Sequence, residues 1–175
     1  TLQRECNRIY GYTAQQTLDY VQSLYEKKLA TYPRTDSQYL TEDMQATAAS
    51  LVLWLREHMP FGKGCTGEPD IDRVMDGSKV TDHHAIIPTV EIARTDLSEL
   101  PSGERDVLTL IAARLLSATV QAHRFEAVTA VLDCQGNSFT AKGKTVLQAG
   151  WKEVERLYRM GLKESKPEDD ENMDA

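Results

Sequence analysis

The sequence predicts a mainly α-helical protein of the α+β class, in which a helical unit is followed by a β-hairpin. Apolar residues recur at three- and four-residue spacing in several stretches before residue 122, which is typical of amphipathic helices. From about residue 123 the period shortens to two and β-branched residues become frequent, which indicates strands. The length of 175 residues and the 41% of apolar residues suit one domain with a real core, or one domain plus part of another.

The first two expected helices are marked by the residues at their ends. Residues 2–10 read as a short helix that Gly11 closes. Thr13 is expected to be the N-cap of a second helix over residues 14–28. The apolar stripe of this second helix comprises Leu18, Val21, Leu24, Tyr25 and Leu29.

Two longer helices are expected further along the chain. Thr41 precedes two acidic residues that complement the dipole of a helix reaching about residue 59. Its core face is expected to hold Leu51, Trp54 and Leu55. Ser102 is expected to cap another helix over residues 103–123. Its inward residues are expected to be Val107, Leu110, Ile111 and Leu115.

Non-helical segments fill the remaining positions. Residues 60–79 are rich in Gly and Pro and are expected to form a long loop, and residues 80–89 read as a short extended piece. Residues 125–151 alternate and turn at Gln135-Gly136-Asn137, which predicts a β-hairpin.

The change of period near His123 predicts a domain boundary. Residues 1–122 are expected to form the helical domain and residues 123–160 a β segment of an adjoining domain. The acidic residues 161–175 are expected to be a disordered tail, because from Lys163 onward charged residues predominate and apolar side chains are few. A helical pattern of residues begins directly after Thr1, so we expect the chain to be a fragment of a longer polypeptide.

Charge and cysteine content exclude several classes of protein. The net charge is −7, but the segment from Lys163 onward holds six acidic and two basic residues, which leaves 21 acidic against 18 basic residues elsewhere. This balance permits a local basic site without indicating one. Cys6, Cys65 and Cys134 form no CxxC pair, so neither a zinc ribbon nor a disulfide framework is indicated, and reduced thiols in a cytosolic protein are expected. No apolar run approaches the ~18 residues of a membrane span.

The usual cofactor motifs are absent or weak. Gly62-Lys63-Gly64 lacks the Ser or Thr of a phosphate-binding P-loop. Asp70-Ile71-Asp72 has a spacing that magnesium sites use, but it lies in a Gly/Pro-rich loop without a preceding strand. His83 and His84 are adjacent, and in an extended segment they would point to opposite faces and could not chelate one ion.

Tyr32 and Arg34, within KKLATYPRTDSQYL at residues 27–40, form a candidate phosphate site. In an extended segment both side chains project from one face, about 6–7 Å apart along the chain. A tyrosine hydroxyl can attack phosphorus, and an arginine can hold two phosphate oxygens. Asp36 and Ser37 could orient Arg34 or donate to the backbone, and His83 could donate to the phosphate or shuttle a proton. From spacing alone, a surface Arg34–Asp36 pair is equally acceptable.

Two of these segments resemble the signatures of a known family. SLYEKKLATYPRTDSQYL is similar to the active-site tyrosine segment of type IA DNA topoisomerases, especially the bacterial topoisomerase III branch. TDHHAIIPT resembles the second signature of that family, at a fitting distance downstream. The helix pair before the tyrosine and the strand segment FTAKGKTVLQAGW also match, so the likeness covers roughly residues 1–155.

The resemblance implies a mechanism and roles for particular residues. Tyr32 would attack a phosphodiester of single-stranded DNA and form a transient 5′-phosphotyrosyl bond, which allows strand passage and resealing without ATP. Arg34 would hold the scissile phosphate, and His83 would contact the phosphate region. Ser37 and His84 are further expected DNA contacts. Gln38 stands where an arginine is frequent in this branch, which weakens one expected backbone contact.

The resemblance also implies parts outside this chain. The helical domain, which includes a helix-turn-helix-like unit, is expected to hang from a strand-rich arch that the chain re-enters near His123. The Mg²⁺ ligands of the full enzyme belong to a Toprim domain that is absent here, so no metal is expected in this chain and the isolated fragment is expected to be inactive. A DNA substrate implies a cytoplasmic, nucleoid-associated enzyme without a membrane partner.

Two other functions compete with this interpretation. One is a helix-turn-helix module that binds DNA without cutting it, and the other is an inert structural domain with a phosphorylatable tyrosine. Neither needs the TYPRTDS and DHHAIIPT segments together, which favours the topoisomerase hypothesis.

Overall fold

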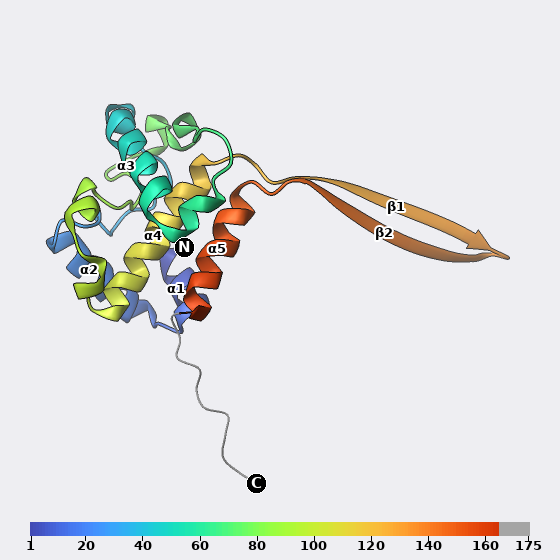
Figure 1. Ribbon diagram of the computed structural model, residues 1–175, viewed down its shortest axis with the longest axis horizontal. Coiled ribbons are helices and arrows are strands. Elements are labelled where there is room, and N and C mark those ends of the chain that lie inside the picture. The colour runs from blue at the N-terminus through green and yellow to red at the C-terminus, as the bar shows by residue number, and fades with distance from the viewer. Residues whose placement is uncertain (165–175) are drawn as a thin grey trace, which may run out of the picture.

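A computed structural model describes residues 1–164 as a helical body from which one long hairpin projects (Figure 1). The acidic residues 165–175, expected to be disordered, lie outside the described residues. None of the described helices is both long and apolar enough to cross a membrane.

Five α-helices and one antiparallel hairpin make up the regular structure of residues 1–164, which confirms the mainly α class of α+β architecture. Short 3₁₀ turns occupy much of the connections between them. The α-helices and strands are α1 (Leu2–Tyr10), α2 (Ala14–Glu26), α3 (Gln45–His58), α4 (Ser102–Thr119), β1 (Arg124–Cys134), β2 (Asn137–Gln148) and α5 (Trp151–Glu164).

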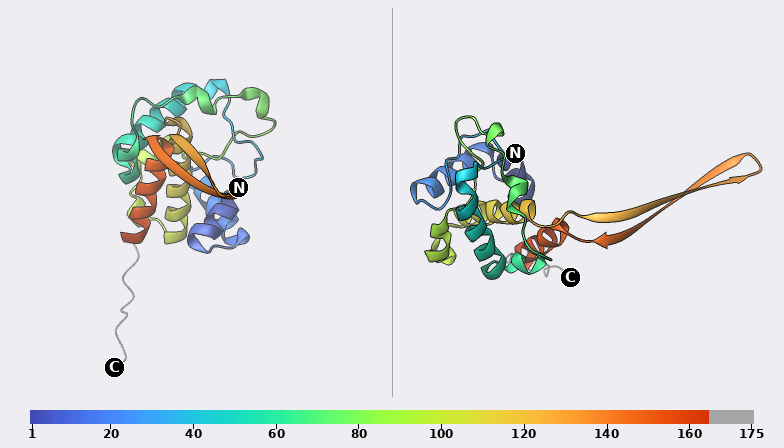
Figure 2. Two further views of the ribbon diagram at one scale, coloured as in Figure 1. Left: turned by 90° about the vertical axis from the view of Figure 1, so that its right-hand side faces the viewer. Right: turned by 90° about the horizontal axis from the view of Figure 1, so that it is seen from above.

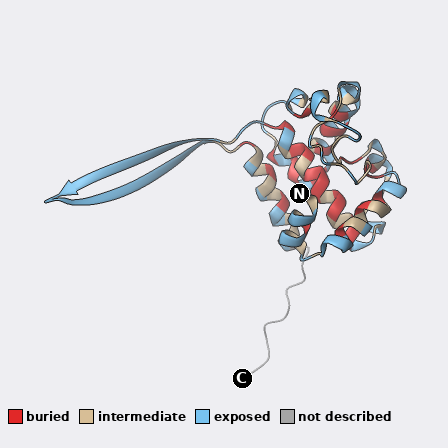
Figure 3. Ribbon diagram, turned by 180° about the vertical axis from the view of Figure 1, so that it is seen from behind, coloured by how far each residue is buried: buried red, intermediate tan, exposed pale blue. Residues whose placement is uncertain are grey.

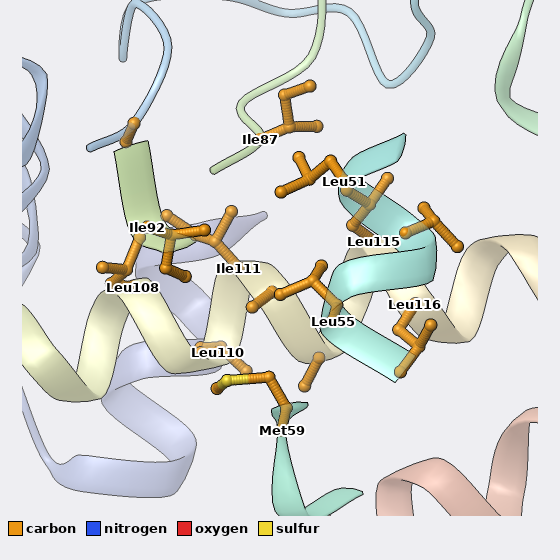
Figure 4. Close-up of a cluster of buried hydrophobic side chains, with 14 of the residues drawn as sticks. Leu51, Leu55, Met59, Ile87, Ile92, Leu108, Leu110, Ile111, Leu115 and Leu116 are labelled. Atoms are coloured by element: carbon orange, nitrogen blue, oxygen red, sulfur yellow. The ribbon is translucent and has the colours of Figure 1, made fainter. Parts of the chain in front are cut away.

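The core of the body forms around α4, which is buried on most of its circumference. Leu108 and Leu116 of α4 are fully buried, and they lie in one cluster with Leu51 and Leu55 of α3 (Figure 4). Each leucine side chain buried in this way stabilises the fold by about 1.5–3 kcal/mol. Ile87, from the loop before α4, joins the same cluster and ties that loop to the core.

The caps of the first two helices are those that the sequence predicts. Gly11 adopts a left-handed conformation with φ 75° after α1. The Thr13 hydroxyl accepts from the Gln16 amide at 3.1 Å, and the Gln16 side chain accepts from the Thr13 amide at 2.9 Å. This reciprocal capping box satisfies two amides that α2 leaves unpaired.

Several helix boundaries differ from the prediction. The helix α2 begins at residue 14 as predicted, but it ends at Glu26 rather than at residue 28. Lys28 has a φ of 62°, which lies outside the range of an α-helix. A 3₁₀ turn precedes α3, and Pro101 rather than Ser102 occupies the N-cap position of α4. The last helix turn of α4 ends at Thr119, because Val120 takes an extended conformation.

The predicted hairpin is present and extends far from the body (Figures 1 and 2). Cys134 pairs with Asn137, so the loop is Gln135-Gly136, and both loop residues have positive φ. Such two-residue loops match the right-handed twist of the strands. Both faces of the hairpin are exposed along nearly its whole length (Figure 3).

The chain does not remain in strands after the hairpin. Residues 151–160, which were expected in the β segment, and residues 161–164, which were expected in the tail, form α5 instead. Val154 and Tyr158 of α5 are buried against the helical body. Burial of these apolar side chains favours a helix here, although the preceding strands have an alternating pattern. The division of the chain into domains stays a prediction.

We predict that Gly64→Ala disturbs the packing of α5. An added Cβ at Gly64 would lie 2.7 Å from the backbone nitrogen of Val154, and that backbone cannot rotate away as a side chain would. The free energy of unfolding, measured by urea denaturation, should therefore fall by about 1–3 kcal/mol.

The matched control for this prediction is Gly161→Ala, within α5 itself. An added Cβ there meets nothing within 4 Å, so the better helix propensity of alanine should raise stability by about 0.5–1 kcal/mol. An unchanged unfolding midpoint for Gly64→Ala would show that α5 does not pack closely at this point.

Candidate active site

Two segments about fifty residues apart lie side by side next to the end of α2. The Thr31 amide donates to the Ile87 carbonyl at 3.0 Å, and the Thr89 amide donates to the Leu29 carbonyl at 3.0 Å. An antiparallel bridge between Ala30 and Pro88 lies between these bonds. The structure therefore brings together the two segments that the sequence singles out.

Thr31 fastens the two segments through its hydroxyl. This hydroxyl donates to the Ala85 carbonyl at 3.2 Å and accepts from the Ile87 amide at 3.0 Å. Two backbone groups of an irregular loop are thus satisfied by one side chain.

Thr35 and Ser37 extend this fastening on the other side of the tyrosine. The Thr35 hydroxyl donates to the His83 carbonyl at 2.7 Å and accepts from the Ser37 amide at 3.1 Å. The Ser37 hydroxyl donates to the Lys79 carbonyl at 2.9 Å. The position of His83 is consequently fixed relative to the segment that carries Tyr32.

Tyr32 lies between two other rings. Its centroid is 4.3 Å from that of His83, with the planes tilted by 43°. The Tyr25 ring, at the end of α2, meets it edge to face at 5.4 Å and 78°. Tyr32 itself is half-buried, while His83 is exposed.

The hydroxyl of Tyr32 differs from those of Tyr10, Tyr12 and Tyr158, which have hydrogen-bond partners in the helical body. Tyr10 and Tyr12 donate to the backbone carbonyl and the carboxylate of Asp106, at 3.1 and 2.6 Å. Burial raises the pKa of Tyr10 and Tyr12, and raises the pKa of Tyr158 to about 12. No residue within 1–164 hydrogen-bonds the Tyr32 hydroxyl, which leaves it free to meet another molecule.

Arg34 is exposed and has no ion-pair partner in the part of the chain that the structure describes. The structure therefore does not contain the alternative surface ion pair between Arg34 and Asp36. Arg34 lines a groove of about 620 Å³ between residues 33–38 and the helices α1, α2 and α4, and neither Tyr32 nor His83 is among the residues that line it. The other arginine of this groove, Arg114, is already paired with Glu5.

The remaining candidate residues have local partners. Nδ1 of His84 lies 2.9 Å from the Ala85 carbonyl, while His83 faces Tyr32, so the two histidines do not converge on one point. Asp72 accepts a hydrogen bond from the Gln45 side chain at 2.8 Å. Among residues 1–164, no group of three or more His, Cys, Asp or Glu residues could hold a metal ion.

Sequence reasoning missed Thr31 and Thr35 as functional positions, and it assigned Tyr25 to the core. The signal for the threonines was their place on either side of a tyrosine in a segment without regular structure, where hydroxyls commonly satisfy the backbone. Tyr25 keeps 41% of its surface exposed because α2 turns this position toward Tyr32 rather than toward α4.

A helical body with a free tyrosine hydroxyl, an unpaired arginine and a histidine in one segment pair defines a candidate phosphoryl-transfer protein. Comparison with known proteins gives the family. A family model described as DNA topoisomerase matches residues 1–174, and the chain belongs to this family, in the type IA, topoisomerase III-like branch that its sequence resembles.

Curated relatives of the chain include bacterial proteins named DNA topoisomerase 3. That of Bacillus cereus (strain ATCC 14579) is 39% identical over 158 residues, which cover 87% of this chain and 21% of the relative. That of Bacillus subtilis (strain 168) is 38% identical over 175 residues, covering 97% and 23%, and that of Bacillus licheniformis is 37% identical over 159 residues, covering 87% and 22%. The chain thus spans less than a quarter of these relatives and corresponds to one part of such an isomerase.

We predict that Thr31→Val loosens the pairing of the two segments. Valine has the shape of threonine but leaves the Ile87 amide without its partner and leaves the Ala85 carbonyl with His84 Nδ1 alone, which costs about 1–3 kcal/mol. Urea denaturation should report this loss, and hydrogen exchange should show faster exchange at Ile87.

Thr47→Val on α3 is the control for this prediction. Thr47 is exposed, so the same change of side chain should alter stability by no more than about 0.5 kcal/mol. Equal effects of the two substitutions would mean that the Thr31 hydroxyl does not fasten the segments.

Proposed function

We propose that this chain is the strand-cutting and rejoining part of a type IA DNA topoisomerase, with Tyr32 as its nucleophile. One observation carries the proposal: the Tyr32 hydroxyl has no protein partner within residues 1–164, while its ring lies 4.3 Å from that of His83. The family membership of the chain supports the reaction, since relatives over this segment are named DNA topoisomerases.

The proposed reaction exchanges one phosphodiester for another. The Tyr32 oxygen attacks a phosphorus atom of single-stranded DNA, a 5′-phosphotyrosyl bond forms, and the bond to the 3′-oxygen breaks. Because the new bond conserves the energy of the old one, the 3′-hydroxyl can reverse the reaction without ATP after another strand has passed through the gap. The result is a change in DNA topology.

Arg34 and His83 would assist this exchange in different ways. Only ~0.1% of a tyrosine with an ordinary pKa near 10 is phenolate at pH 7, so a nearby positive charge is needed. The free guanidinium of Arg34 can hold two phosphate oxygens and stabilise the charge that develops on them. His83, whose ring contacts that of Tyr32, would donate a proton to the departing 3′-oxygen while the phenol proton leaves to solvent. Ser37 and His84 stay predicted DNA contacts, although both already have backbone partners.

The described residues do not suit the Mg²⁺ ion that the family implies. Tyr32, Arg34 and His83 offer a phenol, a cation and an imidazole, whereas Mg²⁺ prefers carboxylate oxygens. We therefore expect the ion to be held by a Toprim domain elsewhere in the longer polypeptide, and the 175-residue chain alone to be inactive. An enzyme that acts on chromosomal or plasmid DNA would work in the cytoplasm, in association with the nucleoid.

The hairpin is the proposed link to a strand-rich arch domain. Its pairing register places Val128, Ala130 and Leu132 of β1 on one face with Phe139 and Ala141 of β2. This apolar face is exposed, with Leu132 at 60% and Phe139 at 58%. An isolated two-stranded hairpin is at best marginally stable in water, so further strands of the longer polypeptide are expected to cover this face.

The nucleophile is tested in the full polypeptide by Tyr32→Phe. The variant should lose DNA relaxation and the covalent protein–DNA complex that denaturant traps, because phenylalanine has no oxygen to attack phosphorus. Arg34→Ala should slow cleavage about 10²- to 10³-fold, as the loss of one charge-stabilising group does elsewhere. Persisting covalent trapping by Tyr32→Phe would refute the proposal.

Oligonucleotide binding separates this function from a helix-turn-helix module that does not cut. The topoisomerase part is expected to prefer single strands, with strong salt dependence, whereas a helix-turn-helix module reads duplex base edges. A duplex preference with base specificity in a gel-shift experiment would favour the module.

The covered face of the hairpin is tested by Leu132→Lys in the full polypeptide. A lysine on the apolar face should destabilise that polypeptide by about 2 kcal/mol, yet leave the 175-residue chain unchanged because the position is exposed there. Thr140→Lys, on the opposite face, is the control and should have little effect in either protein. Equal effects of both lysines would show that this face is not selectively covered.

A further inference from the structure

Tyr25 occupies an unusual position for a residue on an apolar helix stripe. Its neighbours Val21 and Leu24 are 2% and 0% exposed, whereas Tyr25 is 41% exposed at the end of α2. The residue therefore contributes less to the core than its place in the stripe suggests. Its hydroxyl has no partner among residues 1–164, so hydrogen bonding does not account for a tyrosine at this position either.

The contact that Tyr25 does make is with the ring of Tyr32. The two rings meet edge to face, with centroids 5.4 Å apart and planes at 78°. This is a favoured geometry for aromatic pairs, in which the positive edge of one ring meets the negative face of the other. Such a contact restricts the direction in which the Tyr32 ring can turn.

The remaining freedom of Tyr32 is rotation of its side chain. The hydroxyls of Thr31 and Thr35 hold the backbone on both sides of Tyr32 to the segment that carries His83. The side chain can still rotate about two bonds. Tyr25 and His83 are the two rings that contact it, one from a helix and one from the paired loop.

We propose that Tyr25 is a positioning residue that, together with His83, holds the Tyr32 phenol in the orientation from which its oxygen attacks DNA. The inference rests on the proposed role of Tyr32 as nucleophile. A reacting oxygen must lie about 3–3.5 Å from phosphorus and in line with the departing oxygen, and small misplacements slow such reactions strongly. Tyr25 acts through its ring, and its own hydroxyl takes no part.

The experiment compares Tyr25→Leu and Tyr25→Phe in the full polypeptide. The first removes the aromatic ring, and the second keeps the ring but removes the hydroxyl. The rate of covalent complex formation is measured in a single turnover on a saturating single-stranded oligonucleotide, and the Kd of the same oligonucleotide is measured under conditions that do not allow cleavage. The unfolding midpoint in urea checks that each variant is folded, and Tyr25→Met replaces the leucine variant if that one is not.

Tyr25→Leu should slow cleavage about two- to tenfold, the effect of losing one aromatic pair, with a Kd within about twofold of the parent value. Tyr25→Phe should restore most of the rate. The control, Leu53→Ala, changes a side chain of similar exposure (46%) on α3 and should leave the cleavage rate unchanged.

Three results would overturn the inference. An unchanged rate for Tyr25→Leu would show that the ring does not position Tyr32. An equal loss for Tyr25→Phe would assign the effect to the hydroxyl, and a weaker Kd that accounts for the whole loss would assign it to DNA binding. Covalent trapping by Tyr32→Phe in the same assay would instead refute the function on which the inference rests.

Discussion

The pairing of the segment after α2 with the segment before α4 is the constraint on which the site depends. Neither segment belongs to a sheet, and the two are held by a few backbone bonds and by the hydroxyls of Thr31 and Thr35. Backbone groups that are removed from water must be paired, and these hydroxyls supply the partners for several of them. They decide that Tyr32 and His83 lie within ring contact although about fifty residues separate them.

This pairing requires α2 to stop where it does. Lys28 adopts a left-handed conformation with φ 62°, which costs an ordinary residue roughly 1–2 kcal/mol. The structure offsets that cost locally, since the Leu29 amide donates to the Leu24 carbonyl at 2.8 Å and the Thr89 hydroxyl donates to the Lys28 carbonyl. Because α2 ends sharply, the following segment turns back past the last turn of the helix. Tyr25, in that last turn, therefore contacts the ring of Tyr32.

The sequence predicts best where the deciding interactions are local. The N-cap at Thr13, the helix end at Gly11 and the hairpin turn that includes Gln135-Gly136 all depend on neighbours in the chain, and each is present. The exposure of Tyr25 depends instead on where a later segment packs, which helical spacing cannot report. The helix α5 (Trp151–Glu164) is a different case, because its apolar residues have three- and four-residue spacing in the sequence but follow directly on the alternating pattern of the hairpin.

The charge of the candidate site bears on the proposal that this body works as part of a longer polypeptide. In the proposed reaction the phosphodiester under attack gathers negative charge on several oxygens, which the free guanidinium of Arg34 and the imidazole of His83 would have to meet. The other arginine of the groove, Arg114, is already neutralised by Glu5. One fixed cation can orient a phosphate and lower part of the barrier, but it cannot balance the charge on both the attacking and the departing oxygen. On the proposed function, the helical body would hold the nucleophile Tyr32, and further positive charge would come from other parts of the longer polypeptide.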